Sequence, residues 1–153
     1  MKIAFSTVGC PEWSWSDICI MAKDLGYNGI ELRGLENEMN LTKARPFTDA
    51  HLAKTLESLE KRNLSVSCLA SSCYLGGTND EDEALKEGFE YIDLASKLNC
   101  SYVRILGDLN PDPRGESDDA RVIKLLRRLV PAAEEKNVYL LVETAGTYAD
   151  TAR

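Results

Sequence analysis

The apolar positions of this chain follow two patterns that alternate along the sequence. Short runs rich in apolar residues are separated by longer stretches in which apolar residues recur every three or four positions. The short runs predict β-strands, and the longer stretches predict amphipathic helices. The predicted strands are Lys2–Val8, Gly29–Arg33, Ser65–Ser71, Tyr102–Gly107 and Val138–Thr144. The predicted helices are Ser16–Leu25, Asp49–Arg62, residues 81–98 and Asp118–Lys136.

Two of these helices carry further expectations. In the helix over residues 81–98, the spacing predicts a buried stripe formed by Leu85, Phe89, Ile92, Ala95 and Leu98. The last helix contains Pro131, which removes one backbone hydrogen bond and is expected to kink or restart the helix.

The order of the segments predicts a parallel sheet, because each strand after the first follows a helix, as in right-handed βαβ units. The last four strands begin near residues 29, 65, 102 and 138, a regular spacing that suits one βα unit per repeat. A doubly wound sheet normally carries a GxGxxG turn after its first strand. Here that turn, Val8–Trp13, has one glycine and a proline, so a TIM (β/α)8 barrel is favoured.

The length of the chain limits how much of a barrel it can form. A complete barrel takes about 250 residues, whereas this chain has 153. We therefore expect an α/β fold that is an incomplete TIM barrel, with about five parallel strands and four helices. Residues 1–153 would form a single domain, equivalent to the N-terminal part of a barrel.

Alternation within each strand predicts which side chains face the barrel axis. A charge buried without a partner against the apolar helix layer is costly, so the charged positions are assigned to the inside. The predicted inward residues are Ala4, Ser6, Glu31, Arg33, Ser67, Leu69, Ser71, Arg104 and Glu143. The predicted outward residues are Ile3, Phe5, Ile30, Leu32, Val66, Cys68, Ala70, Val103, Ile105, Leu140 and Val142.

The inward charges point to a polar ligand. Active sites of parallel barrels lie at the carboxyl ends of the strands, where Glu31, Arg33, Ser71 and Glu143 are placed. Together with Arg104 they suit a hydroxylated or anionic small molecule. An internal network of Glu31/Arg33 and Arg104/Glu143 salt bridges is the alternative. Trp13 either stacks on a sugar ring at this rim or packs the entry to the first helix.

Composition excludes several other classes of function. The net charge of −7 argues against nucleic-acid binding, which needs a basic face. Five cysteines without a CxxC pair suggest reduced thiols in a cytoplasmic protein, and a single histidine, His51, argues against a zinc site within this chain. No apolar run is long enough to span a membrane.

Four segments resemble the xylose isomerase-like TIM-barrel superfamily: Lys2–Thr7, Gly29–Arg33, Tyr102–Ile105 and, most closely, Leu140–Thr144. That superfamily includes sugar and sugar-phosphate isomerases and epimerases, and also the endonuclease IV type of DNA-repair enzyme. The resemblance implies that Glu143 is catalytic and is a ligand of a divalent metal ion (Mn, Mg, Zn or Co) beside the substrate. It also implies that the other ligands come from strands six to eight, which this chain lacks. Ala145 stands where similar sequences often have histidine.

The function implied by the resemblance is isomerisation or epimerisation of a carbohydrate or polyol. The strand alternation and the rim loop make Glu31, Arg33, Ser71, Arg104 and Trp13 the candidate substrate contacts. We expect this chain alone to bind metal weakly or not at all, and to be inactive, with Glu143 paired to Arg104. A non-catalytic half-barrel that binds a partner or itself is the alternative. In either case the exposed edges of the first and fifth strands predict a homo-oligomer.

Overall fold

The computed structural model describes residues 1–77, 80–108, 112 and 115–149, which form an α/β fold. The strands are β1 (Ala4–Ser6), β2 (Gly29–Leu32), β3 (Ser65–Tyr74), β4 (Tyr102–Leu106) and β5 (Tyr139–Glu143). The helices are α1 (Trp15–Asp24), α2 (Asp49–Arg62), α3 (Glu81–Lys97) and α4 (Asp119–Glu135). Short 3₁₀ helices are η1 (Thr7–Gly9), η2 (Leu41–Lys43), η3 (Arg45–Phe47) and η4 (Gly146–Ala149).

The sheet follows the order of the sequence. All neighbouring strands are parallel, and the order is β1-β2-β3-β4-β5. A doubly wound sheet would reverse its strand order at one point, and a barrel does not. The described residues therefore form an incomplete parallel barrel, as the sequence predicted.

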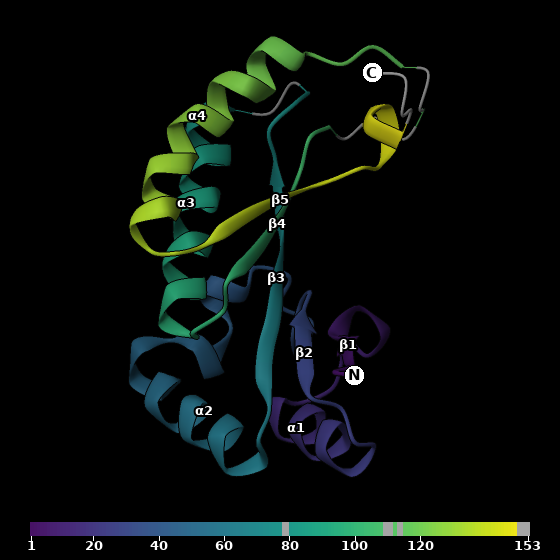
Figure 1. Ribbon diagram of the computed structural model, residues 1–153, viewed down its shortest axis with the longest axis vertical. Helices are drawn as coiled ribbons and strands as arrows, with labels where there is room; N and C mark the ends of the chain where they lie inside the picture. Colours follow the sequence, from purple (N-terminus) through teal and green to yellow (C-terminus); the bar gives the residue numbers. More distant parts are fainter. Residues whose placement is uncertain (78–79, 109–111, 113–114, 150–153) are drawn as a thin grey trace.

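The helices lie on the outer side of the sheet. Figure 1 shows α3 and α4 side by side along one face of β3, β4 and β5, and the described helices leave the opposite face uncovered. On the covered side Ile30, Leu32, Val103 and Ile105 are completely buried in the core. Their burial confirms the outward faces predicted for β2 and β4.

The faces predicted for β3 are wrong beyond Val66. The register steps from Ile30↔Val66 to Glu31↔Cys68, so one extra residue, Ser67, is inserted in β3. Leu69 then pairs with Leu32 and is fully buried in the helix-side core, while Cys68 shares the position of Glu31. Such a bulge exchanges the two faces of a strand, and alternation read from the sequence does not reveal it.

The helix ends follow their capping chemistry. Ser14 caps α1 by accepting a hydrogen bond from the Asp17 backbone N–H. Asn63, Asn99 and Asn137 follow α2, α3 and α4 in the left-handed region, with φ of 55°, 54° and 55°. Asparagine tolerates this conformation better than most residues, and it turns the chain into the next strand.

One expectation about the helices is corrected, and one of the two alternatives at Pro131 is excluded. Phe89 is 37% exposed, because the buried face of α3 is formed by Ala84, Leu85, Gly88, Tyr91, Ile92, Leu94 and Ala95. Pro131 lies inside α4, which continues as one helix to Glu135 instead of restarting. No helix in the described part of the chain is both long enough and apolar enough to cross a membrane.

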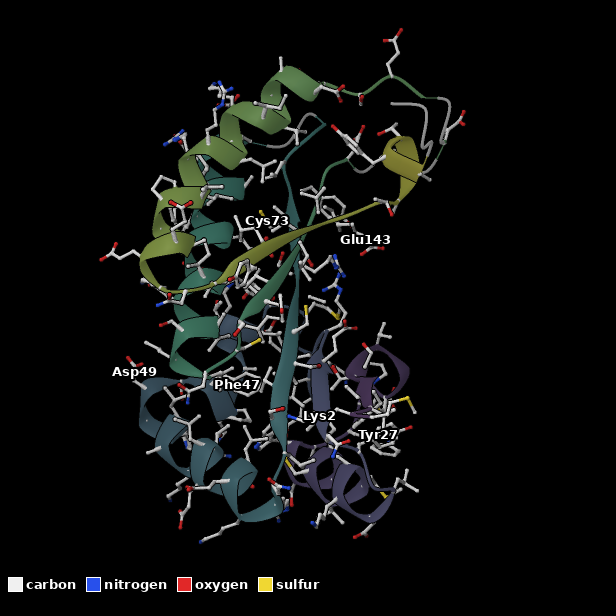
Figure 2. All side chains as sticks on the ribbon, in the orientation of Figure 1. Lys2, Tyr27, Phe47, Asp49, Cys73 and Glu143 are labelled. Carbon is white, nitrogen blue, oxygen red and sulfur yellow. The ribbon has the colours of Figure 1, made fainter. Side chains whose placement is uncertain are left out.

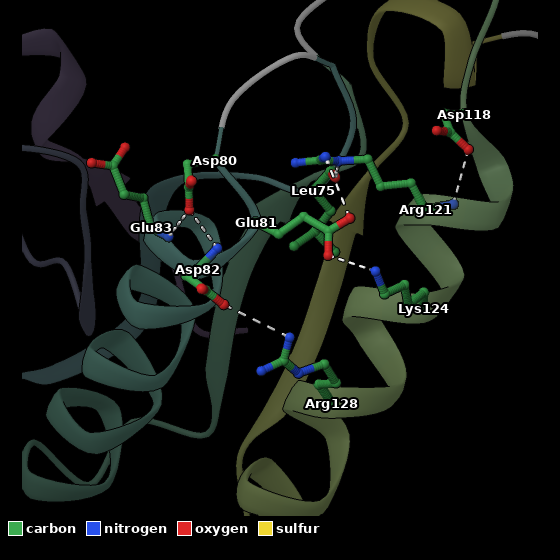
Figure 3. A network of polar contacts seen from close by, with 9 residues as sticks. All are labelled: Leu75, Asp80, Glu81, Asp82, Glu83, Asp118, Arg121, Lys124 and Arg128. Atoms are coloured by element: carbon green, nitrogen blue, oxygen red, sulfur yellow. Dashed lines mark hydrogen bonds and ion pairs between the residues drawn. The ribbon is translucent and has the colours of Figure 1, made fainter.

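Ion pairs join α3 to α4 near their first turns. The carboxylate of Glu81 lies 2.6 Å from Lys124 Nζ and 3.5 Å from Arg121 Nη1 (Figure 3). Arg121 Nε also donates to the carbonyl oxygen of Leu75, just beyond β3, at 2.9 Å. The loop that leaves β3 is therefore held against α4, which fixes one part of the rim at the carboxyl ends of the strands.

Candidate functional site

The best-defined polar contact on the uncovered face joins β4 to β5. Arg104 Nε lies 3.0 Å from Glu143 Oε2, and Arg104 Nη1 donates to the carbonyl oxygen of Ser71 at 2.8 Å. Figure 2 shows Glu143 on the side of the sheet away from α3 and α4. The predicted pairing of Arg104 with Glu143 is confirmed. The Arg104 side chain is 18% exposed and that of Glu143 is 47% exposed, so the carboxylate remains accessible.

Ser71 supports this pair from within the sheet. Its hydroxyl donates to the carbonyl oxygen of Arg104 at 2.7 Å and accepts from the Cys73 backbone N–H at 3.2 Å. Ser71 is completely buried. Its side chain therefore binds β3 to β4 beside Arg104, and contact with a ligand would require the hydroxyl to leave these bonds.

Glu31 lies on the same face of the sheet as the Arg104–Glu143 pair, and its neighbour Cys68 on β3 connects the two. The register pairs Glu31 with Ser6 on one side and with Cys68 on the other. Burial is the main cause that raises the pKa of the Cys68 thiol to about 11; the Glu31 charge raises it further, and Arg104 lowers it. Glu31 and Arg104 are thus both close enough to act on one thiol, which places them in one electrostatic neighbourhood.

The charge of Arg33 acts on a carboxylate that the sequence did not single out, Glu87. Burial raises the pKa of Glu87 on α3, and the Arg33 charge partly offsets that rise. Glu87 Oε1 accepts a hydrogen bond from the Ser72 backbone N–H at 2.9 Å. Arg33 Nη1 is buried without a hydrogen-bond partner among the described residues. Glu87 could have been noticed because it precedes the buried Tyr91 by one helical turn.

Trp13 lies away from the Arg104–Glu143 pair. It is 41% exposed and lines a groove of about 210 Å³. The groove is lined by Phe5, Ser6, Gly9, Cys10, Trp13, Met21, Leu25 and Tyr27. These residues belong to β1, α1 and the segments around them, at the opposite edge of the sheet from β5. In the described part of the chain Trp13 therefore lies beside the first helix, and its stacking on a sugar ring stays a prediction.

The described residues do not make a metal site by themselves. Among them, no group of three or more His, Cys, Asp and Glu side chains is arranged to hold a metal ion. Glu143 offers one carboxylate, and its nearest charged partner is the Arg104 guanidinium. Divalent cations need several oxygen or nitrogen ligands, so the donor set present here does not fit one.

A parallel strand–helix repeat whose strand order never reverses defines the class of this protein as a parallel βα-barrel, present here in part. The family model of the xylose isomerase-like TIM barrel matches residues 20–152. The chain belongs to this family. No protein of curated function matches the sequence significantly.

Several solved structures share the fold of this chain. The probable 3-DHS dehydratase AsbF, involved in petrobactin synthesis in Bacillus anthracis, has a TM-score of 0.76 at 18% identity, covering 97% of this chain and 54% of its own. D-psicose 3-epimerase, solved in the presence of D-fructose, has a TM-score of 0.75 at 13% identity, covering 98% and 54%. The IOLI protein with a bound zinc atom has a TM-score of 0.71 at 16% identity, covering 93% and 51%. This chain spans about half the length of these relatives.

Proposed function

We propose that this chain supplies the N-terminal part of a carbohydrate or polyol isomerase or epimerase in which Glu143 is the catalytic carboxylate. The observation that carries the proposal is the Arg104–Glu143 pair, which lies on the uncovered face with its carboxylate at the end of β5. The family assignment and the epimerase among the structural relatives support the reaction class.

The chemistry follows from the two side chains. A carboxylate of this kind removes the proton from the carbon next to a substrate carbonyl and returns it at another position or face. Arg104 holds Glu143 through Nε and contributes a positive charge that favours negative charge developing on a substrate oxygen. Glu31, Arg33 and Ser71 are proposed to contact or support the substrate from β2 and β3, and Trp13 is retained as a more remote contact.

A divalent metal ion is part of the proposal only for the complete barrel. The zinc-containing relative supports this view. The further ligands would come from residues outside those described, because the donor set described here does not fit a metal ion. We propose that the chain alone binds metal weakly or not at all and is inactive, and that the protein is cytoplasmic.

Self-association is the second proposal, and a specific observation favours it. In β5 the side chains of Tyr139, Leu141 and Val142 are 65%, 42% and 37% exposed. An uncovered edge strand with exposed apolar side chains favours pairing with another chain. A half-barrel that binds itself or a partner without catalysis would show this property while lacking proton-transfer activity.

Solvent-deuterium exchange tests the proposed function. A complete barrel that contains this chain would be incubated in D₂O with a panel of ketoses, and deuterium at the carbon next to the carbonyl would be followed by NMR. We expect exchange by the wild type and a loss of about 10²-fold or more in Glu143→Gln, since a positioned acid–base group contributes that much. Glu60→Gln, the same change at an exposed position of α2, is the matched control. Equal exchange rates in Glu143→Gln and the wild type would refute the proposal.

A further inference from the structure

The segment after β5 folds back onto the end of β4. η4 begins at Gly146, three residues after Glu143, and Gly146 has a φ of 57°. The Tyr148 ring lies directly over Gly107, because a Cβ atom added to Gly107 would be 2.5 Å from a ring carbon of Tyr148. Glycine at position 107 thus permits a ring contact that other residues would obstruct.

Hydrogen bonds fix the same segment to two further elements. Tyr148 Oη donates to Asp119 Oδ1, in the first turn of α4, at 2.9 Å. Thr147, which is completely buried, donates through Oγ1 to Asp108 Oδ2 at 3.3 Å. Burial and the Asp119 carboxylate raise the pKa of Tyr148 to about 12, so the phenol remains protonated and able to donate at neutral pH. We call Gly107, Asp108, Asp119, Thr147 and Tyr148 the rim clasp.

The rim clasp is adjacent to the candidate catalytic carboxylate. Glu143 pairs in register with Leu106, the residue before Gly107. Gly107 is itself held from the other side, because its carbonyl oxygen accepts a hydrogen bond from the Gly76 N–H at 2.6 Å. The backbone around Glu143 is therefore fixed by the β4 ladder before it and by Tyr148 after it.

We propose that Tyr148 is a positioning residue for Glu143: the rim clasp fixes the end of β5 so that the Glu143 carboxylate is held against Arg104. Without the Tyr148–Asp119 hydrogen bond, the segment after β5 would still be held by the Thr147–Asp108 bond and the ring contact with Gly107, but Glu143 would sample other directions more often. The effect of this positioning on catalysis depends on the proposed function of Glu143. The rim clasp itself is inferred only from the contacts described above.

NMR of the Arg104 Nε–H group in the full chain tests the proposal, since its resonance reports the charge-assisted bond to Glu143. Glu143→Gln defines the resonance without that bond. We expect Tyr148→Phe, which keeps the ring and removes the hydroxyl, to move the resonance at least halfway toward the Glu143→Gln position. Gly107→Ala, which displaces the ring from the other side, should move it in the same direction.

Thr55→Val is the matched control. It removes a buried hydroxyl that donates to the Pro46 carbonyl oxygen at 2.6 Å, far along the chain from β5. We expect it to lower the Tm without moving the Arg104 resonance, which separates positioning from general stability. An unmoved resonance in both Tyr148→Phe and Gly107→Ala would overturn the clasp proposal, whatever the activity.

Activity measurements then distinguish the two proposals. In a complete barrel that contains this chain, Tyr148→Phe should lower kcat more than it changes KM, because the phenol contacts Asp119 and is not among the proposed substrate contacts. If the Arg104 resonance moves and Glu143→Gln retains full deuterium exchange, the clasp is supported and the catalytic role of Glu143 is refuted.

Discussion

Single residues in this protein owe their properties to partners far away in the sequence. Glu87 is the clearest case, because it lies on a helix yet its carboxylate is bonded to the backbone of β3 and lies within the field of Arg33. Glu143 shows the opposite situation, an accessible carboxylate whose neighbour is a cation. Each leads to a prediction for that residue alone.

Glu87 makes the stability of the fold depend on pH. Its pKa in the folded state is raised above that in the unfolded chain, so the folded state holds its proton more tightly. The resulting stabilisation is present below the unfolded pKa and is lost as the pH rises through the folded pKa. Glu87→Gln keeps an oxygen acceptor for Ser72 and removes the charge.

We therefore expect Glu87→Gln to be more stable than the wild type at pH 8, by less than about 1 kcal/mol for this half-buried group, with a smaller difference near pH 4. Urea unfolding at both pH values measures this difference, and Glu60→Gln serves as the control. A wild type that gains stability relative to Glu87→Gln between pH 4 and pH 8 would contradict the assignment.

Glu143 should bind metal poorly in this chain. One carboxylate beside Arg104 offers too few ligands, and the guanidinium repels a cation. Calorimetric titration of Mn²⁺ into the chain is expected to give a Kd in the millimolar range or weaker, comparable with that of Glu143→Gln. Tight binding that survives the Glu143→Gln change would show that the site lies elsewhere.

At the scale of elements, the rim depends on close approach of backbones. A Cβ atom added to Gly76 would lie 2.5 Å from the carbonyl oxygen of Gly107. That oxygen belongs to the backbone directly after β4 and accepts a hydrogen bond from the Gly76 N–H, so it has little freedom to move. The loops that follow β3 and β4 are therefore joined at a point that tolerates only glycine.

Gly76→Ala is expected to destabilise the chain by about 1–3 kcal/mol through this overlap. Gly9→Ala is the natural comparison, because a Cβ atom at Gly9 meets nothing within 4 Å. That control should leave stability unchanged or raise it by about 0.4–1 kcal/mol. Both values come from urea unfolding, and equal stabilities of the two variants would show that the loops can separate without cost.

For the whole molecule, the main consequence of an incomplete barrel is exposed apolar surface. The inner face of β5 carries Leu141 at 42% exposure, and the strand has one neighbour, β4, among the described residues. In a closed barrel this edge would be paired and the interior filled by side chains.

We expect the chain to sediment as a dimer or larger assembly at micromolar concentration. Leu141→Lys should shift it toward monomer, because a charge on an edge strand opposes pairing. Ile123→Lys, at a position of α4 that is 47% exposed, controls for the added charge. Analytical ultracentrifugation provides the measurement; a wild-type monomer with a cooperative thermal transition would contradict the expectation.

The sequence by itself determined the elements, their parallel order and one contact of the candidate site. Helical and strand periodicities are local, so they predicted α2 at its observed bounds and the buried faces of β2 and β4. The parallel order of the strands then predicted the pairing of Arg104 with Glu143. The tertiary structure alone decided the bulge in β3, the half-buried Glu87 and the contact of Tyr148 with Gly107. The physical reason is that each of these depends on the packing of segments distant in the chain, and local periodicity carries no record of which segment meets which.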